Sequence, residues 1–258
     1  MAVADLLVVV IQVILVNIIN IYIAPECKIV KTVGYMSVAC SVWLTVAFTF
    51  DRTVAICFQK LKTRYCTKKG AAVVIAAVSV LSVLTNIPWY FTYRSRFCMT
   101  SLDFITLPVW AAFDWGHRIL TPLIPFVLIL LLNAVTIRHI LMASAVRRKL
   151  RGQHRGEGKD DTEMKNRRKS IILLFTISAS FILLWATRVV ILSIQRITGR
   201  YMTQYVTNVV IDYLGTMLQL FSSCTNTFIY AVTQRKFREE VIHAVKCPFK
   251  AILKFIKS

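Results

Sequence analysis

Hydrophobic residues along the chain gather into long runs instead of alternating with polar residues. A helix that crosses a lipid bilayer needs about 20 mostly apolar residues, and its backbone must satisfy its own hydrogen bonds there, so such runs predict spanning helices. A membrane β-barrel would alternate every second residue, which Leu128–Leu132 does not. We therefore predict an all-α membrane protein with a single transmembrane domain over residues 1–258. Its six predicted spans cover residues 1–23, 29–58, 71–92, 117–142, 170–195 and 204–232.

Basic residues lie between the apolar runs, and they predict how the bundle is oriented. The net charge is +20, from 32 Lys and Arg against 12 Asp and Glu. Segments 59–69, 143–169 and 234–258 carry most of the Lys and Arg, and cytoplasmic loops of membrane proteins are enriched in both. We therefore expect these segments, including the C-terminus, in the cytoplasm. We also expect 143–169 to be mobile, because it is highly charged and poor in apolar residues.

Two broad functional classes receive no support. Nucleic-acid binding would place the basic residues on a folded face, but here they separate spans. The sequence contains no His-Glu-x-x-His, Gly-x-Ser-x-Gly or phosphate-loop motif, so we predict that the protein is not an enzyme. A multi-spanning transporter is the alternative among membrane proteins. Transporters show paired broken helices in corresponding halves of the sequence, and no such symmetry is present.

A few ionisable residues interrupt the apolar runs. They are Asp5, the pair Asp51-Arg52, Arg188 and Asp212. A charged side chain at the centre of a spanning helix costs roughly 2.5–3.5 kcal/mol on insertion scales, so such residues indicate functional sites in membrane proteins. For Asp51-Arg52 the alternative is an ordinary helix end, whose long side chain reaches the aqueous boundary.

Several of these polar residues fall within short motifs whose order along the chain is informative. The motifs are Met1–Asp5, Cys27 placed 25 residues before Arg52, Phe50-Asp51-Arg52-Thr53, Pro125, Phe181 with Trp185, and Asn226-Thr227-Phe228-Ile229-Tyr230. In this order and spacing they resemble the motifs of the rhodopsin-like (class A) G-protein-coupled receptors. Within that family, Ser41–Val46, Asn86–Tyr90 and Trp185–Arg188 are similar to the orphan group around probable G-protein coupled receptor 139.

The resemblance implies a seven-transmembrane receptor bundle that begins within its second helix. Six spans would be present, helix one would be missing, and an amphipathic helix would follow in the tail at 234–258. The implied protein is a multi-pass receptor of the plasma membrane. It would transmit binding of an extracellular small-molecule or peptide ligand to a heterotrimeric G protein, of Gq type by likeness to the 139-like group. The alternative within this reading is a truncated fragment that does not signal.

The resemblance also implies a ligand pocket between the outer halves of the helices. Trp185 would form its floor, with Tyr35 and His117 on its walls. Arg188 lies one helical turn above Trp185 and would anchor an acidic or neutral ligand. The alternative for Arg188 is an ion pair with Asp212, because leaving either charge bare in the bundle is more costly.

A mid-membrane sodium site is implied by the same family pattern. Its ligands would be Asp5, Ser41, Ser222 and Asn226, and no other cofactor is predicted. A hard cation prefers oxygen ligands, and a buried carboxylate requires a compensating charge or hydrogen bonds. The alternative is a protonated Asp5 that is hydrogen-bonded by the serines and Asn226 alone.

At the inner end, the resemblance implies a G-protein switch made of Asp51, Arg52 and Tyr230. A planar guanidinium held by a neighbouring carboxylate can exchange partners when helices move.

The cysteines have separate expected roles. By resemblance, Cys27 would form a disulfide with Cys98, which tethers the outer loop in an oxidising compartment. Cys247 lies near basic and apolar residues of the tail and is a palmitoylation candidate, with an ordinary thiol as the alternative.

Overall fold

The structure is a computed structural model, and the regular secondary structure of its described part is helical, which confirms the predicted all-α class. The structure describes residues 2–11, 27–58, 61, 63, 66–93, 101, 104, 106–151, 172, 175–176, 178–187, 189–191, 193–194, 197, 206–233 and 239, with the backbone alone at 2–3, 144–151, 206–209, 211–212 and 226–233. The predicted spans 1–23 and 170–195 are therefore described only in part.

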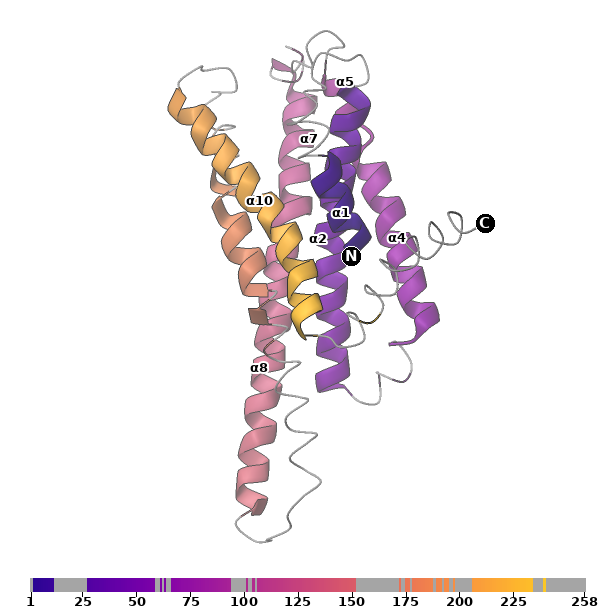
Figure 1. Ribbon diagram of the computed structural model, residues 1–258, viewed down its shortest axis with the longest axis vertical. Coiled ribbons are helices and arrows are strands. Elements are labelled where there is room, and N and C mark those ends of the chain that lie inside the picture. The colour runs from indigo at the N-terminus through magenta and orange to yellow at the C-terminus, as the bar shows by residue number, and fades with distance from the viewer. Residues whose placement is uncertain are drawn as a thin grey trace, which may run out of the picture.

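The helices stand side by side as an elongated bundle (Figure 1). Three stretches of the described chain are long and apolar enough to cross a membrane, namely Cys27–Cys57, Lys68–Thr92 and Pro108–Ala143. A shorter apolar helix covers Ser178–Ile191. The elements are α1 (Ala2–Val9), α2 (Cys27–Cys57), α4 (Lys68–Asn86), α5 (Trp89–Thr92), α7 (Pro108–Arg118), the π-helix η3 (Ile119–Leu123), α8 (Ile124–Arg151) and α10 (Val206–Thr233).

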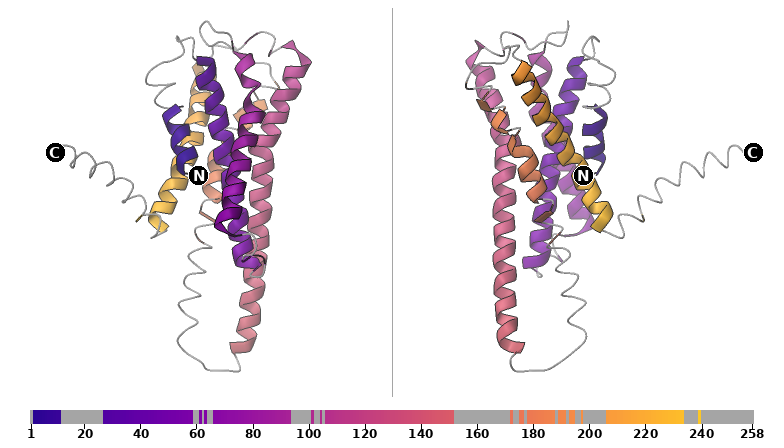
Figure 2. Two further views of the ribbon diagram at one scale, coloured as in Figure 1. Left: turned by 90° about the vertical axis from the view of Figure 1, so that its right-hand side faces the viewer. Right: turned by 60° about the vertical axis from the view of Figure 1, so that its left-hand side comes forward.

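Helix α2 is the centre of the bundle. It packs against α1, α4, α5 and α8, while α1 also packs against α10 (Figures 1 and 2). Over the most apolar stretch of α2, 56% of the residues are buried inside the bundle, whereas over the corresponding stretch of Lys68–Thr92 only 11% are buried. A core cluster joins α1, α2, α8, α10 and the helix Ser178–Ile191, and it is made of Val8, Val38, Val42, Val46, Ile129, Phe181, Trp185 and Leu220.

Helix α4 presents a broad apolar surface to the outside of the bundle. Its exposed side chains include Val73, Val80, Leu81 and Leu84, each more than half exposed. A contiguous apolar face of this size on a helix is typical of contact with lipid rather than water. The surface therefore agrees with the predicted membrane location.

The long helical stretch Pro108–Ala143 contains a π-helical turn at its middle. Pro122 and Pro125 have no backbone N–H, so they cannot make the usual helical hydrogen bonds. The chain adapts with η3, in which the N–H of Ile124 donates to the carbonyl of Ile119. The helix therefore continues past two prolines, with its backbone locally widened.

Two boundaries differ from the sequence prediction. The span predicted at 117–142 begins earlier, at Pro108, because Asp114 and Arg118 pair with each other within the helix and so tolerate the apolar environment. Helix α8 extends to Arg151, so residues 143–151 of the predicted mobile loop are helical. Arg, Lys, Leu and Ala are strong helix formers, and they continue the helix beyond the bundle (Figure 2).

Candidate functional site

An aromatic cluster lies at the end of the bundle where α5 and the first turns of α2 meet, at the top in Figure 1. Tyr35 stacks on Trp89 with ring centroids 4.4 Å apart, and the edge of His117 faces Trp89 at 5.2 Å. Tyr35 and His117 are themselves 6.1 Å apart. Two of the predicted pocket residues therefore meet, joined by a tryptophan that was not among them. We call this group the outer aromatic cluster, and its members are Tyr35, Trp89, Phe104, Trp110, Phe113 and His117.

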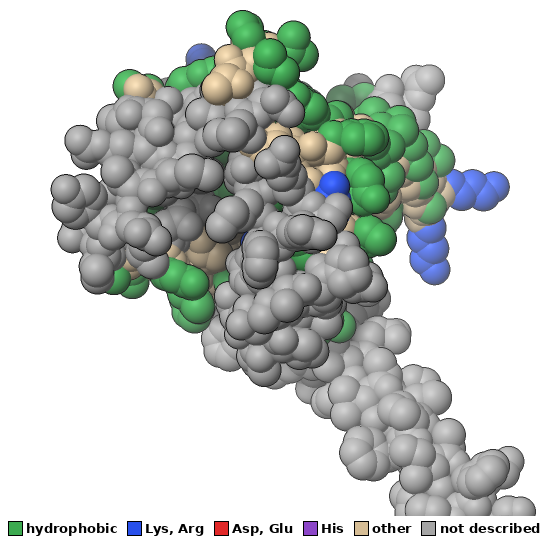
Figure 3. Space-filling view, turned by 90° about the horizontal axis from the view of Figure 1, so that it is seen from above, with side chains coloured by type: hydrophobic (Ala, Val, Ile, Leu, Met, Phe, Trp, Pro, Cys, Tyr) green, Lys and Arg blue, Asp and Glu red, His purple; other side chains and the backbone are tan. Residues whose placement is uncertain are grey.

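Most of the described side chains visible from above this end are hydrophobic (Figure 3). The outer aromatic cluster also has few polar atoms. The hydroxyl groups of Tyr35 and Tyr93 are 3.0 Å apart and share a hydrogen bond. The indole N–H of Trp89 is buried and reaches no hydrogen-bond acceptor in the described part of the chain. The cluster is thus an apolar surface with a small number of polar atoms, as ligand sites commonly are.

His117 is held by a hydrogen bond to a different helix. Its Nε2 lies 2.9 Å from Oδ1 of Asn86, which is fully buried at the end of α4. The amide nitrogen of Asn86 donates to the carbonyl of Ser82 over 2.7 Å. The hydroxyl of Thr121 is a more distant neighbour of the same Nε2, at 3.3 Å. Asn86 was expected as part of a family motif but not as a site residue, because only the fold brings α4 and α7 together.

A buried ion pair lies beside His117 on α7. Arg118 Nη2 and Nε are each 3.0 Å from the same carboxylate oxygen of Asp114, and the Asp114 side chain is 2% exposed. The other terminal nitrogen of Arg118, Nη1, has no hydrogen-bond partner among the described residues. The sequence shows this pair as an i, i+4 spacing, which favours contact on one helix face.

Trp185 belongs to the interior of the bundle. It is 6% exposed and packs against Phe181, with ring centroids 5.7 Å apart. Both rings join the core cluster that links α1, α2, α8 and α10. The other predicted pocket residue of this helix, Arg188, lies outside the described residues. So do the side chains of Asp212, Asn226 and Tyr230.

Asp5 lies where α1 packs against both α2 and α10. Its side chain is 2% exposed, and Oδ1 accepts a hydrogen bond from the Ser41 hydroxyl. Ser222 and Ser223 are also buried, on α10. The part of this group that is described is therefore a buried carboxylate hydrogen-bonded to one hydroxyl group, and oxygen atoms of this kind suit a hard cation.

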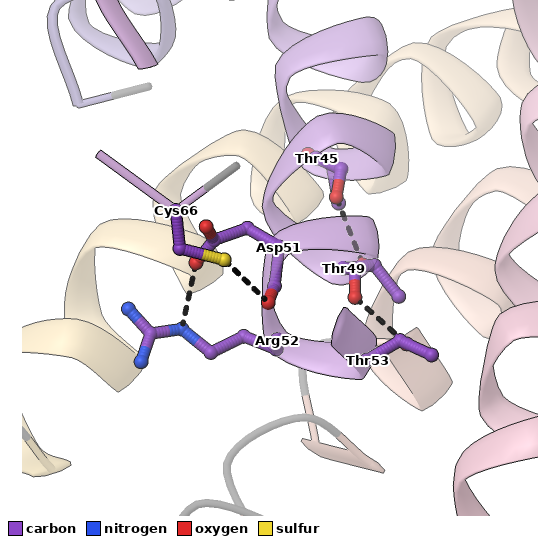
Figure 4. Close-up of polar contacts among 6 residues, drawn as sticks. All are labelled: Thr45, Thr49, Asp51, Arg52, Thr53 and Cys66. Carbon is purple, nitrogen blue, oxygen red and sulfur yellow. Dashed lines mark hydrogen bonds and ion pairs between the residues drawn. The ribbon is translucent and has the colours of Figure 1, made fainter. Parts of the chain in front are cut away.

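The Asp51-Arg52 pair lies at the inner end of α2 (Figure 4). Arg52 Nε is 3.8 Å from Asp51 Oδ2, and both side chains are more than a third exposed. This distance allows an ion pair but no hydrogen bond, and Arg52 Nε has no hydrogen-bond partner among the residues that the structure describes. The guanidinium lies 4.9 Å from the Phe48 ring centroid, and the Cys66 thiol lies 3.9 Å from the Asp51 carbonyl. Arg52 is therefore held loosely.

A row of threonines descends the buried face of α2 towards this pair. Thr45, Thr49 and Thr53 each donate to the carbonyl four residues earlier, over 2.8–2.9 Å. Figure 4 shows that the row ends beside Arg52. Thr53 also accepts a hydrogen bond from Thr136 of α8 over 3.1 Å, and the Thr136 hydroxyl is fully buried. Thr136 was absent from the predicted site because sequence spacing gives no sign of a contact between helices.

Cys27 is in a disulfide bond. Its predicted partner Cys98 lies outside the described residues, as does Cys247, so the pairing and the palmitoylation stay predictions. Cys40, Cys57, Cys66 and Cys224 are not in disulfide bonds.

A family model described as the 7 transmembrane receptor (rhodopsin family) matches residues 1–230. Probable G-protein coupled receptor 142 of Mus musculus is 25% identical over 83% of this chain and 54% of its own length. Galanin receptor 2a of Danio rerio is 23% identical over 87% of this chain and 59% of its own length. C5a anaphylatoxin chemotactic receptor 1 of Oncorhynchus mykiss is 23% identical over 86% of this chain and 62% of its own length. The chain thus spans little more than half the length of these curated relatives.

Proposed function

The chain belongs to the rhodopsin family of seven-transmembrane receptors, and on that premise we propose that it transmits the binding of an extracellular ligand to a heterotrimeric G protein. The predicted membership of the rhodopsin-like family is confirmed, and its relatives are receptors, not enzymes. The transporter alternative therefore loses its basis. The closer placement with the 139-like orphan group stays a prediction, although one relative is probable receptor 142.

The observation that carries the proposal is the state of Arg52 at the inner end of the central helix. Among the described residues its charge partner is Asp51, whose carboxylate oxygen is 3.8 Å from Arg52 Nε, and the guanidinium is partly exposed. A weak, solvent-screened ion pair contributes little stability, so little free energy is needed for Arg52 to change partner. A G-protein segment inserted at this end of the bundle would meet a partly exposed cation. The proposed orientation has this end in the cytoplasm, where the basic segments 59–69 and 143–169 are also expected from the sequence.

The ligand would bind at the opposite end, over the outer aromatic cluster. We propose a small molecule or a peptide, with Arg188 as the anchor for an acidic group and Trp185 below it. The curated relatives are named for galanin and for the anaphylatoxin C5a, so their ligands differ from one another. The proposed G protein is of Gq type, by likeness to the 139-like group.

A sodium ion at Asp5 is the second part of the proposal. Asp5 and the hydroxyl oxygen of Ser41 would bind it, with Ser222 and Asn226 completing the ligands. Support comes from the burial of the carboxylate and from its hydroxyl neighbour. A bound cation would compensate a charge that is costly to bury.

Formation of a nucleotide-free complex tests the proposal. The purified chain in lipid nanodiscs is mixed with heterotrimeric Gq, and bound nucleotide is removed with apyrase. We expect the two to elute together and to separate when a non-hydrolysable GTP analogue is added. Arg52→Ala should form little complex, while Lys31→Ala, a change at the other end of the same helix, should behave as the unmodified chain. Equal complex formation by both variants would count against a role for Arg52, and no complex from any chain would reject the proposed function.

A further inference from the structure

The hydrogen bonds around Asn86 determine which of its side-chain atoms faces His117. The carbonyl of Ser82 can only accept a hydrogen bond, so the Asn86 atom 2.7 Å from it must be the amide nitrogen. The remaining atom, Oδ1, then points at His117 Nε2 over 2.9 Å. An amide oxygen can only accept, and therefore Nε2 must carry the proton that joins the two side chains.

The surroundings of His117 favour a neutral imidazole. Its partner on α4 is an uncharged amide, and the carboxylate of Asp114, three residues earlier on α7, is already paired with Arg118 over 3.0 Å. The other neighbours in the outer aromatic cluster are the rings of Tyr35, Trp89 and Phe113. A neutral imidazole with a proton on Nε2 has a lone pair on Nδ1. No hydrogen bond reaches Nδ1 from any residue that the structure describes.

We propose that Asn86 is a positioning residue that fixes His117 in the Nε2–H form, so that Nδ1 selects ligands that place an N–H or O–H donor against the outer aromatic cluster. The Thr121 hydroxyl supports the same ring orientation from one turn along the helix. The apolar rings exclude water from the contact, which strengthens a hydrogen bond there and penalises a ligand that lacks the donor. This assignment of ligand chemistry rests on the proposed receptor function, whereas the form of the imidazole does not.

The position of the imidazole proton can be measured directly. The chain has four histidines, so His139, His154 and His243 are replaced with Gln and the remaining His117 is labelled with ¹⁵N. In lipid nanodiscs at neutral pH we expect one protonated nitrogen, assigned to Nε2, and one unprotonated Nδ1. Asn86→Leu should give a mixture of both neutral forms, while Thr121→Val, which removes the more distant neighbour, should retain the Nε2–H form. A protonated Nδ1 in the otherwise unmodified chain, or an imidazolium, would overturn the proposal even if Asn86→Leu does not fold.

Two aromatic probes of matched size test the selectivity for a donor. Phenol has an O–H donor, and anisole has the same ring without one. We expect phenol to shift the Nδ1 resonance and to bind about fivefold more tightly than anisole, the ratio expected of one hydrogen bond. Equal shifts with both probes, or a phenol shift confined to Nε2, would reject the selectivity. Neither readout involves a G protein, so these results and the failure of complex formation with Gq are distinguishable.

Discussion

The hydrogen bond between Thr53 and Thr136 is expected to couple α2 to α8 at the inner end of the bundle. Thr53 uses its own proton for the carbonyl of Thr49, so it accepts the proton of Thr136 over 3.1 Å. Thr136 shares that proton with the carbonyl of Leu132, 2.9 Å away. Replacing either residue with Val keeps the shape of the side chain and removes the hydroxyl. Each single variant also loses a bond within its own helix, so neither alone measures the contact between helices.

A double-mutant cycle isolates that contact. Hydrogen bonds between helices in membrane proteins contribute about 0.6 kcal/mol on average and up to about 1.7 kcal/mol. Both hydroxyl groups are almost completely buried, so we expect a coupling of about 0.6–1.7 kcal/mol between Thr53→Val and Thr136→Val. The measurement is the free energy of unfolding in mixed micelles of lipid and SDS, followed by tryptophan fluorescence.

A second cycle provides the matched control. Thr85 lies on α4, and its hydroxyl bonds to carbonyls of its own helix. Thr85→Val combined with Thr136→Val should therefore be additive within about 0.3–0.5 kcal/mol. A coupling between Thr53 and Thr136 no larger than in this control would refute the contact as a link between α2 and α8.

Three further predictions concern the core, the ion pair and the sodium ion. Phe181→Ala empties a position that is 2% exposed and should lower the free energy of unfolding by about 3–5 kcal/mol, while Leu183→Ala, at 72% exposed, should change it far less; equal losses would contradict the packing. Asp114→Asn leaves a largely buried guanidinium without its carboxylate and should lower the free energy of unfolding by about 3–5 kcal/mol. The double variant Asp114→Leu with Arg118→Met removes both charges, so in the same assay it should recover most of that loss. Sodium chloride, compared with choline chloride at equal ionic strength, should stabilise the chain by about 1.4 kcal/mol at ten times the sodium Kd, and a similar gain in Asp5→Asn would exclude Asp5 as the ligand.

The sequence allowed the helical class, the family and the approximate positions of the long spans to be predicted, because runs of about 20 apolar residues are a direct consequence of bilayer thickness. The helix boundaries were less predictable. In the sequence, Asp114 and Arg118 suggest a loop, because their pairing is visible only in the structure. The basic residues after 143 suggest a mobile loop, although such residues also form helices well. Local composition alone does not decide between these outcomes.

The candidate site was predicted only where a family motif marks a residue. Tyr35 and His117 do meet, but the contacts that hold them involve Trp89 and Asn86, whose roles depend on how α4 lies against α2 and α7. In the same way, the polarity of Thr136 gives no indication that it contacts Thr53. Such pairs are far apart in the sequence, and only the packing of helices determines them.

Nucleotide exchange on a G protein shows whether Arg52 connects this helix bundle to G-protein activation. The chain is reconstituted into lipid bilayers with heterotrimeric Gq, and the rate of GTP-analogue binding is measured without added ligand. Because Arg52 Nε lies 3.8 Å from the Asp51 carboxylate and makes no hydrogen bond to any residue that the structure describes, we expect a rate above that of the G protein alone, and a return to that rate with Arg52→Ala. A rate equal to that of the G protein alone, or an Arg52→Ala variant as active as the unmodified chain, would contradict the account.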